Sequence, residues 1–133
     1  MGSSARSLEP AVKATCQILI VEDDADTRDA LAIFLERHGY AVALATDGAD
    51  GLRQLRAGLR PRLILLDLMM PEKNGLQFRV EQVVDPELAD IPVVIYSGDA
   101  EARATGATFG GVACLAKPID VGKLLDLVQA HCQ

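Results

Sequence analysis

Three uninterrupted apolar runs constrain the fold of this chain more than any other feature of its sequence. The runs are ILIV at 18–21, LILL at 63–66 and VVIY at 93–96. Because none of them alternates with polar residues, each is typical of a strand buried on both faces of a parallel sheet. Two weaker strands are expected at residues 40–45 and 112–116.

Amphipathic segments fill the intervals between these runs. Helices are expected over residues 25–38, 47–57, 75–84, 100–109 and 121–132. Asp24 and Asp47 are suited to cap the first two helices, and Gly39 and Gly58 are suited to end them. Strands that alternate with helices of this length imply right-handed crossovers and helices on both faces of a sheet. The sequence therefore predicts a doubly wound α/β fold with five parallel strands and five helices.

The composition is that of one soluble domain. The chain has 133 residues, half of them hydrophobic, and a net charge of −6, which argues against non-specific nucleic-acid or membrane binding. No apolar run approaches the roughly 18 residues of a membrane span, and no signal peptide is visible. Cys16, Cys114 and Cys132 form an odd, widely spaced set that indicates reduced thiols and a cytoplasmic location. We expect a flexible tail at 1–15 and the domain at 16–133.

Chemically competent residues follow four of the five expected strands. Glu22 and Asp23 come directly after the first strand, and Asp67 follows the third. Ser97 follows the fourth strand and Lys117 the fifth. Because the carboxyl ends of parallel strands meet at one edge of a sheet, and ligands of such folds bind there, these side chains are expected to form one site.

Three carboxylates at one edge need neutralising charge. Two like charges about 4 Å apart repel by about 4 kcal/mol at an effective dielectric of about 20. Lys117 and a divalent cation are the expected neutralisers of Glu22, Asp23 and Asp67. An oxygen-only site fits Mg²⁺. An aspartate beside Mg²⁺, a lysine and a hydroxyl is suited to accepting a phosphoryl group.

The sequence resembles the receiver domain of bacterial response regulators. The segments that carry the resemblance are ILIVEDD at 18–24, LILLDLMMPEKNG at 63–75, IPVVIYSGD at 91–99 and CLAKP at 114–118. It extends over residues 17–132. It implies a flavodoxin-like sheet with strand order 2-1-3-4-5, and a signalling module rather than a conventional enzyme.

The resemblance also implies a role for each site residue. Asp67 is the phosphoacceptor, which takes its phosphoryl group from a phosphohistidine. Asp23, Asp67 and the backbone carbonyl of Met69 ligate Mg²⁺, and Glu22 contributes through a metal-bound water. Lys117 pairs with the phosphoryl group. The hydroxyl of Ser97 turns toward the phosphate.

Partners, too, are implied by the resemblance. A sensor histidine kinase or phosphotransfer protein would dock by the first helix and the site loops. A downstream protein would bind the face made by the fourth helix, fifth strand and fifth helix.

The Lys117–Pro118 bond is expected to be cis. The chain departs from the family at Cys114 and Ile119, where aromatic rings are usual, and this puts the family's aromatic switch in doubt.

Three other functions are weighed against this one. A phosphatase of the haloacid dehalogenase type needs an aspartate two residues after its nucleophile, but position 69 is Met. A nucleotide or flavin binder needs a phosphate loop after the first strand, where an acidic triplet stands instead. A receiver-like module that works without phosphorylation stays open.

Overall fold

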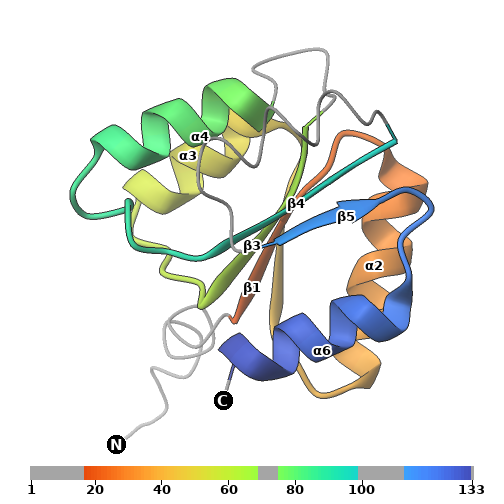
Figure 1. Cartoon of the computed structure of the whole chain (residues 1–133). Coiled ribbons are helices and arrows are strands. Elements are labelled where there is room, and N and C mark those ends of the chain that lie inside the picture. Colours follow the sequence, from red (N-terminus) through yellow and green to blue (C-terminus); the bar gives the residue numbers. More distant parts are fainter. Residues whose placement is uncertain (1–16, 69–74, 99–112, 133) are drawn as a thin grey trace, which may run out of the picture.

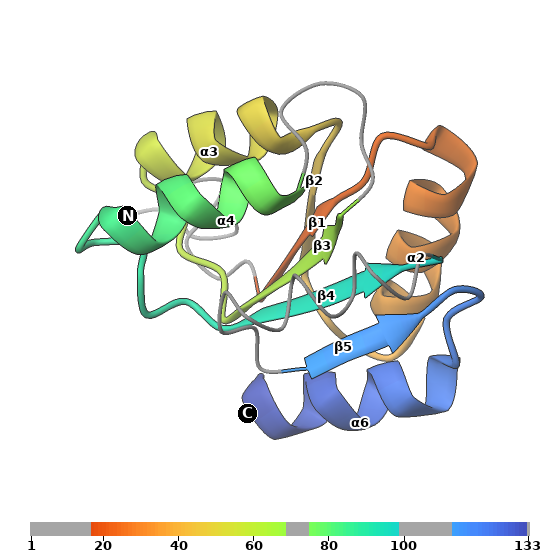
Figure 2. The same cartoon turned by 45° about the horizontal axis from the view of Figure 1, so that its top comes forward.

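One parallel sheet of five strands forms the middle layer of the chain (Figures 1 and 2). The computed structural model describes residues 17–68, 75–98 and 113–132. The strands are β1 (Ile18–Val21), β2 (Val42–Ala45), β3 (Leu63–Asp67), β4 (Val93–Ser97) and β5 (Ala113–Ala116). Their order is β2-β1-β3-β4-β5, and every neighbouring pair is parallel. The predicted sheet and its strand order are confirmed.

The helices cover both faces of this sheet. Those in the described ranges are α2 (Ala25–Arg37), α3 (Gly48–Arg56), α4 (Gly75–Val84) and α6 (Val121–His131). Helices α2 and α6 lie together on one face, and α3 and α4 lie on the other (Figures 1 and 2). The expected tail at 1–15, the expected helix at 100–109 and Met69 lie outside the described residues. No helix of the described part is long and apolar enough to cross a membrane.

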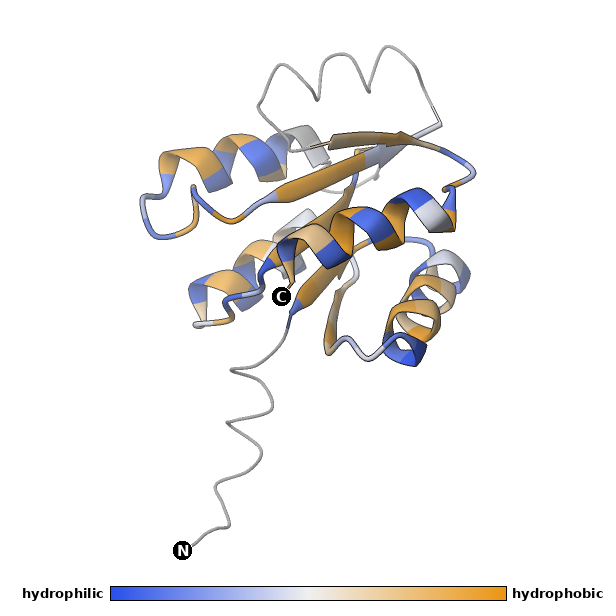
Figure 3. Ribbon diagram, turned by 60° about the horizontal axis from the view of Figure 1, so that its bottom comes forward, coloured by the Kyte–Doolittle hydropathy of each residue, from blue (hydrophilic) through white to orange (hydrophobic). Residues whose placement is uncertain are grey.

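Two separate hydrophobic clusters result, because successive side chains of a strand point to opposite faces of the sheet. The cluster toward α2 and α6 includes Ile18, Ile20, Leu35, Leu124 and Val128. The cluster toward α3 and α4 includes Leu19, Val21, Leu52, Leu55 and Phe78. Figure 3 shows the hydrophobic strands between helices that carry both hydrophobic and hydrophilic residues. The unbroken apolar runs are thus explained by burial on both sides.

Local signals set the helix boundaries as the sequence predicts. The side chain of Asp24 accepts a hydrogen bond from the backbone N–H of Thr27 and caps α2. Asp47 caps α3 through the N–H of Asp50. Gly39 follows α2 with φ at +91°, a conformation that side-chain-bearing residues rarely adopt. Helix α2 therefore ends shortly before β2. It begins just after Glu22 and Asp23, the acidic residues that follow β1.

Candidate metal and phosphoryl site

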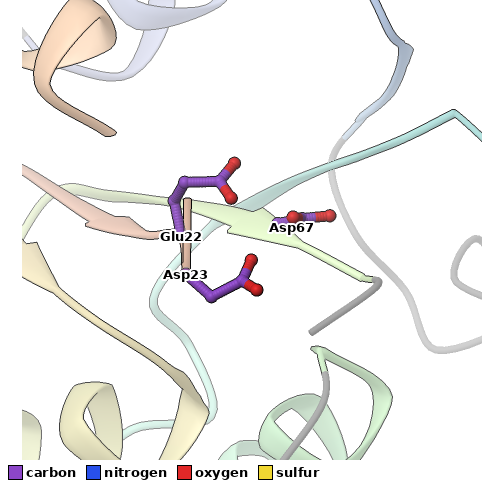
Figure 4. A group of neighbouring side chains, drawn as sticks. All are labelled: Glu22, Asp23 and Asp67. Atoms are coloured by element: carbon purple, nitrogen blue, oxygen red, sulfur yellow. The ribbon is translucent and has the colours of Figure 1, made fainter. Parts of the chain in front are cut away.

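An acidic cluster lies at the carboxyl ends of β1 and β3. Carboxylate oxygens of Glu22, Asp23 and Asp67 all lie within 4.8 Å of one another. Figure 4 shows Glu22 and Asp23 extending from the end of β1 toward Asp67. Glu22 and Asp67 are each only 1% exposed, whereas Asp23 faces solvent. The predicted convergence of these three residues is confirmed.

Lys117 brings the positive charge to the cluster. Its Nζ lies 3.1 Å from Oδ2 of Asp67, and it forms the ion pair that the sequence predicts there. The backbone N–H of Lys117 donates to the carbonyl of Ser97 at 3.1 Å, which joins the end of β5 to the end of β4. The Lys117–Pro118 bond is cis, as expected. Lys117 is thus held at the same edge as the carboxylates.

Ser97 is the last residue of β4 and is fully buried. In the register of β4 with β5, Ser97 lies opposite Ala116. Ala116 is the residue that directly precedes Lys117. This position places Ser97 at the predicted edge of the sheet. The backbone carbonyl expected from Met69 lies outside the described residues.

Gly75, the first residue of α4, packs directly against the backbone of the phosphoacceptor candidate. A Cβ atom at position 75 would lie 2.5 Å from the carbonyl oxygen of Asp67 and 2.7 Å from Cα of Leu68. The N–H of Gly75 also donates to the carbonyl of Leu68 at 3.2 Å. Only glycine allows this close approach. The start of α4 therefore packs against the backbone of Asp67 and Leu68 and holds it in position.

Tyr96 also belongs to the site, although its place at the end of the apolar run at 93–96 predicts only a buried core residue. It is fully buried, and its hydroxyl donates to Oε1 of Glu22 at 2.5 Å. Desolvation and, next, the hydrogen bond with Glu22 raise the pKa of the phenol, so it keeps its proton. A signal existed in the sequence: a tyrosine that ends a buried apolar run needs a polar partner for its hydroxyl.

The electrostatics of the cluster favour a bound cation. Among the described residues, three carboxylates lie together at this edge, and the ammonium of Lys117 forms an ion pair with one of them, Asp67. Two unit charges at this spacing repel by about 3–4 kcal/mol at an effective dielectric of about 20. Desolvation, together with the Glu22 carboxylate, raises the pKa of Asp23 above its ordinary value. The oxygen donors present fit Mg²⁺, which prefers carboxylates and retains several waters.

The fold and the site together define a class: an α/β protein with an acidic, lysine-paired site at the carboxyl edge of its parallel sheet. Residues 18–129 match the family described as response regulator receiver domain. The chain is 38% identical over 116 residues to the DNA-binding dual master transcriptional regulator RpaA of Synechocystis. That match covers 86% of this chain and 48% of RpaA, so the chain spans about half of that relative.

Other relatives match over nearly their whole length. Protein PilH of Pseudomonas aeruginosa is 35% identical over 116 residues, which is 86% of this chain and 95% of PilH. The crystal structure of a response regulator receiver protein from Pseudomonas putida superposes with a TM-score of 0.81 at 30% identity, over 88% of this chain and 98% of that one. This chain belongs to the response regulator receiver domain family of two-component signalling.

Proposed function

We propose that Asp67 accepts a phosphoryl group from a phosphohistidine of a sensor kinase or phosphotransfer protein, in a reaction that depends on Mg²⁺. The observation that carries the proposal is the environment of one carboxylate. Asp67 is 1% exposed, its Oδ2 lies 3.1 Å from the ammonium of Lys117, and its oxygens lie within 4.8 Å of two further carboxylates. A nucleophile, a fixed cation and a set of metal ligands thus share one edge of the sheet.

Each residue has a defined part in this reaction. A carboxylate oxygen of Asp67 attacks the phosphorus in line, a P–O bond forms, and the P–N bond to the donor imidazole breaks. The ammonium of Lys117 neutralises charge on the transferring oxygens. The hydroxyl of Ser97 donates to one of those oxygens once the group is in place. The chain thereby assists its own phosphorylation and dephosphorylation.

Mg²⁺ would be held directly by Asp23, Asp67 and the backbone carbonyl of Met69, with Glu22 acting through a metal-bound water. When bound, the metal supplies charge neutralisation at the transferring phosphoryl group. The support for this assignment is the donor set, since Glu22, Asp23 and Asp67 offer only oxygen ligands within 4.8 Å of one another.

The kinase or phosphotransfer protein would dock beside the site, along α2 and the loops at the carboxyl edge. A pocket of about 340 Å³ lies there, lined by Phe34 of α2 and by Ile119 and Val121 near α6. The downstream protein would bind residues 100–132, which include β5 and α6. A cytoplasmic location belongs to the same proposal, as does the lack of direct nucleic-acid binding, which rests on the net charge of −6.

Phosphorylation by a small donor tests this function. The protein is incubated with acetyl phosphate and Mg²⁺, and intact mass spectrometry counts the phosphoryl groups. We expect one group on the wild type, none after chelation of the metal, and none on Asp67→Asn. A wild type that stays unmodified under all conditions would favour the alternative, a receiver-like module that works without phosphorylation.

A further inference from the structure

Tyr96 connects two parts of the acidic site that lie on different strands. It stands on β4 opposite Asp67 in the register with β3. Its hydroxyl reaches across β3 to Oε1 of Glu22, at the end of β1, at 2.5 Å. The centroid of its ring lies 5.1 Å from Nζ of Lys117, which follows β5. One side chain therefore contacts both the buried glutamate and the lysine that pairs with Asp67.

The hydroxyl completes the set of donors around the Glu22 carboxylate. Oε1 accepts from Tyr96, and Oε2 accepts from the backbone N–H of Asp24 at 3.0 Å. Because Glu22 is 1% exposed, bulk water has little access to replace a missing donor. With one donor on each oxygen, the plane of the carboxylate is fixed relative to Asp23 and Asp67.

The ring has a separate role at Lys117. An ammonium within about 6 Å of an aromatic centroid is attracted by the ring. The same ammonium lies 3.1 Å from Oδ2 of Asp67, so the ring contacts the cation that pairs with that carboxylate. The ring and the hydroxyl of Tyr96 thus act on different partners, and different substitutions can separate them.

We infer that Tyr96 is a positioning residue of this site: its hydroxyl orients Glu22 for Mg²⁺, and its ring holds Lys117 in place for phosphoryl transfer. The inference rests on the proposed function and deepens it. Side chains that orient metal ligands typically change metal affinity by 10–100-fold when they are replaced. Glu22 is expected to act through water, so the low end of this range applies.

Two substitutions separate the role of the Tyr96 hydroxyl from the role of its ring. Tyr96→Phe removes the hydroxyl and keeps the ring, whereas Tyr96→Leu removes both. Titration calorimetry with Mg²⁺ should show an affinity about ten-fold weaker for Tyr96→Phe. At saturating Mg²⁺, that variant should take the phosphoryl group from acetyl phosphate at close to the wild-type rate. Tyr96→Leu should stay slower even at saturation, because Lys117 has lost its support.

A general loss of stability would not by itself weaken Mg²⁺ binding in this way. A matched control variant tests this point. Val94→Ala truncates a buried side chain on the same strand and in the same core cluster. It should lower the melting temperature and leave the affinity for Mg²⁺ unchanged. Coupling gives a second check: in a Glu22→Ala background, Tyr96→Phe should cause no further loss of affinity, because its partner is gone.

A variant at position 96 that does not fold still leaves a measurement. The chain has two tyrosines and no tryptophan, so Tyr40→Phe leaves Tyr96 as its one tyrosine fluorophore. Tyr40 precedes β2, at the opposite edge of the sheet from the site. Adding Mg²⁺ to this variant should change its tyrosine fluorescence with the same midpoint as the calorimetric titration.

The failure of this inference differs from the failure of the proposed function. Phosphorylation of the wild type, with unchanged Mg²⁺ affinity in Tyr96→Phe or a silent Tyr96 fluorescence, would overturn the positioning role alone. A full ten-fold loss that persists in the Glu22→Ala background would also overturn it. A wild type that binds Mg²⁺ but takes no phosphoryl group would overturn the proposed function, while weaker binding by Tyr96→Phe would still support the role in orienting Glu22.

Discussion

The ammonium of Lys117 lies 3.1 Å from Oδ2 of Asp67, so one ion pair joins the ends of β5 and β3 across the intervening strand β4. The carboxylate is 1% exposed, whereas 35% of the lysine side chain is accessible. Such a pair leaves the aspartate shielded from water and the lysine open to an incoming group. The contact therefore matters for the stability of the fold, and under the proposed function it would also neutralise charge during phosphoryl transfer.

Removal of this lysine should destabilise the metal-free protein. Lys117→Met removes the cation that pairs with the buried carboxylate of Asp67, and we expect a loss of about 1–3 kcal/mol in the free energy of unfolding. The value lies below that for a fully buried pair because water reaches the lysine. Lys123→Met, at an exposed position of α6, is the control and should change little. Urea denaturation measures both, and equal stabilities would contradict the role given to the pair.

Asp23 should oppose folding without metal and support binding with it. Asp23→Asn removes one of three mutually repelling charges, so the melting temperature of the metal-free protein should rise. For the wild type, free Mg²⁺ at 100 times its dissociation constant should add about 2.7 kcal/mol of stability. Asp23→Asn should lose most of that gain. Asp126→Asn, on α6, is the control and should keep that gain. If Mg²⁺ leaves the melting temperature of the wild type unchanged, the metal assignment is wrong.

The raised pKa of Asp23 predicts a pH dependence of known sign. Its ordinary value is 3.8, and desolvation with the Glu22 carboxylate raises it in the folded state. Between the unfolded and the folded pKa, the native state binds more protons at this group, so this group's contribution to stability falls as the pH rises. Affinity for Mg²⁺ should weaken as the pH falls through the same window, because protonation removes a ligand. Calorimetric titrations across that range test this, and an unchanged affinity would contradict it.

The switching behaviour should differ from that of relatives with a ring on β5. Cys114 is half-buried and packs against the cluster toward α3 and α4, but a thiol cannot fill or vacate a ring-sized space. We expect Ser97→Ala to weaken phosphorylation-dependent binding and Cys114→Ala to leave both phosphoryl uptake and binding nearly unchanged. NMR with a beryllofluoride mimic is the measurement. Large shifts centred on Cys114, lost in Cys114→Ala, would show that the thiol relays the signal.

The sheet and most of the site could be predicted because short segments of sequence determine both a buried strand and the residue that follows it. A run such as LILL before Asp67 fixes both a buried strand and the side chain at its end. The contact of Tyr96 with Glu22 could not be predicted from spacing alone, because it depends on a ring that spans β3. Likewise, the approach of Gly75 to the Asp67 carbonyl depends on where α4 begins in space.

Chemical trapping of the modified residue tests the central claim most directly. Borohydride reduces an aspartyl phosphate to homoserine, which peptide mass spectrometry locates along the chain. After incubation with acetyl phosphate and Mg²⁺, we expect homoserine at position 67 and none at Asp23. Reduction of a glutamyl phosphate would give 2-amino-5-hydroxypentanoic acid, and we expect none of it at Glu22, the other acidic neighbour of Asp67. Homoserine at position 23, or a phosphorylated protein without homoserine at position 67, would contradict the assignment of Asp67 as the phosphoacceptor.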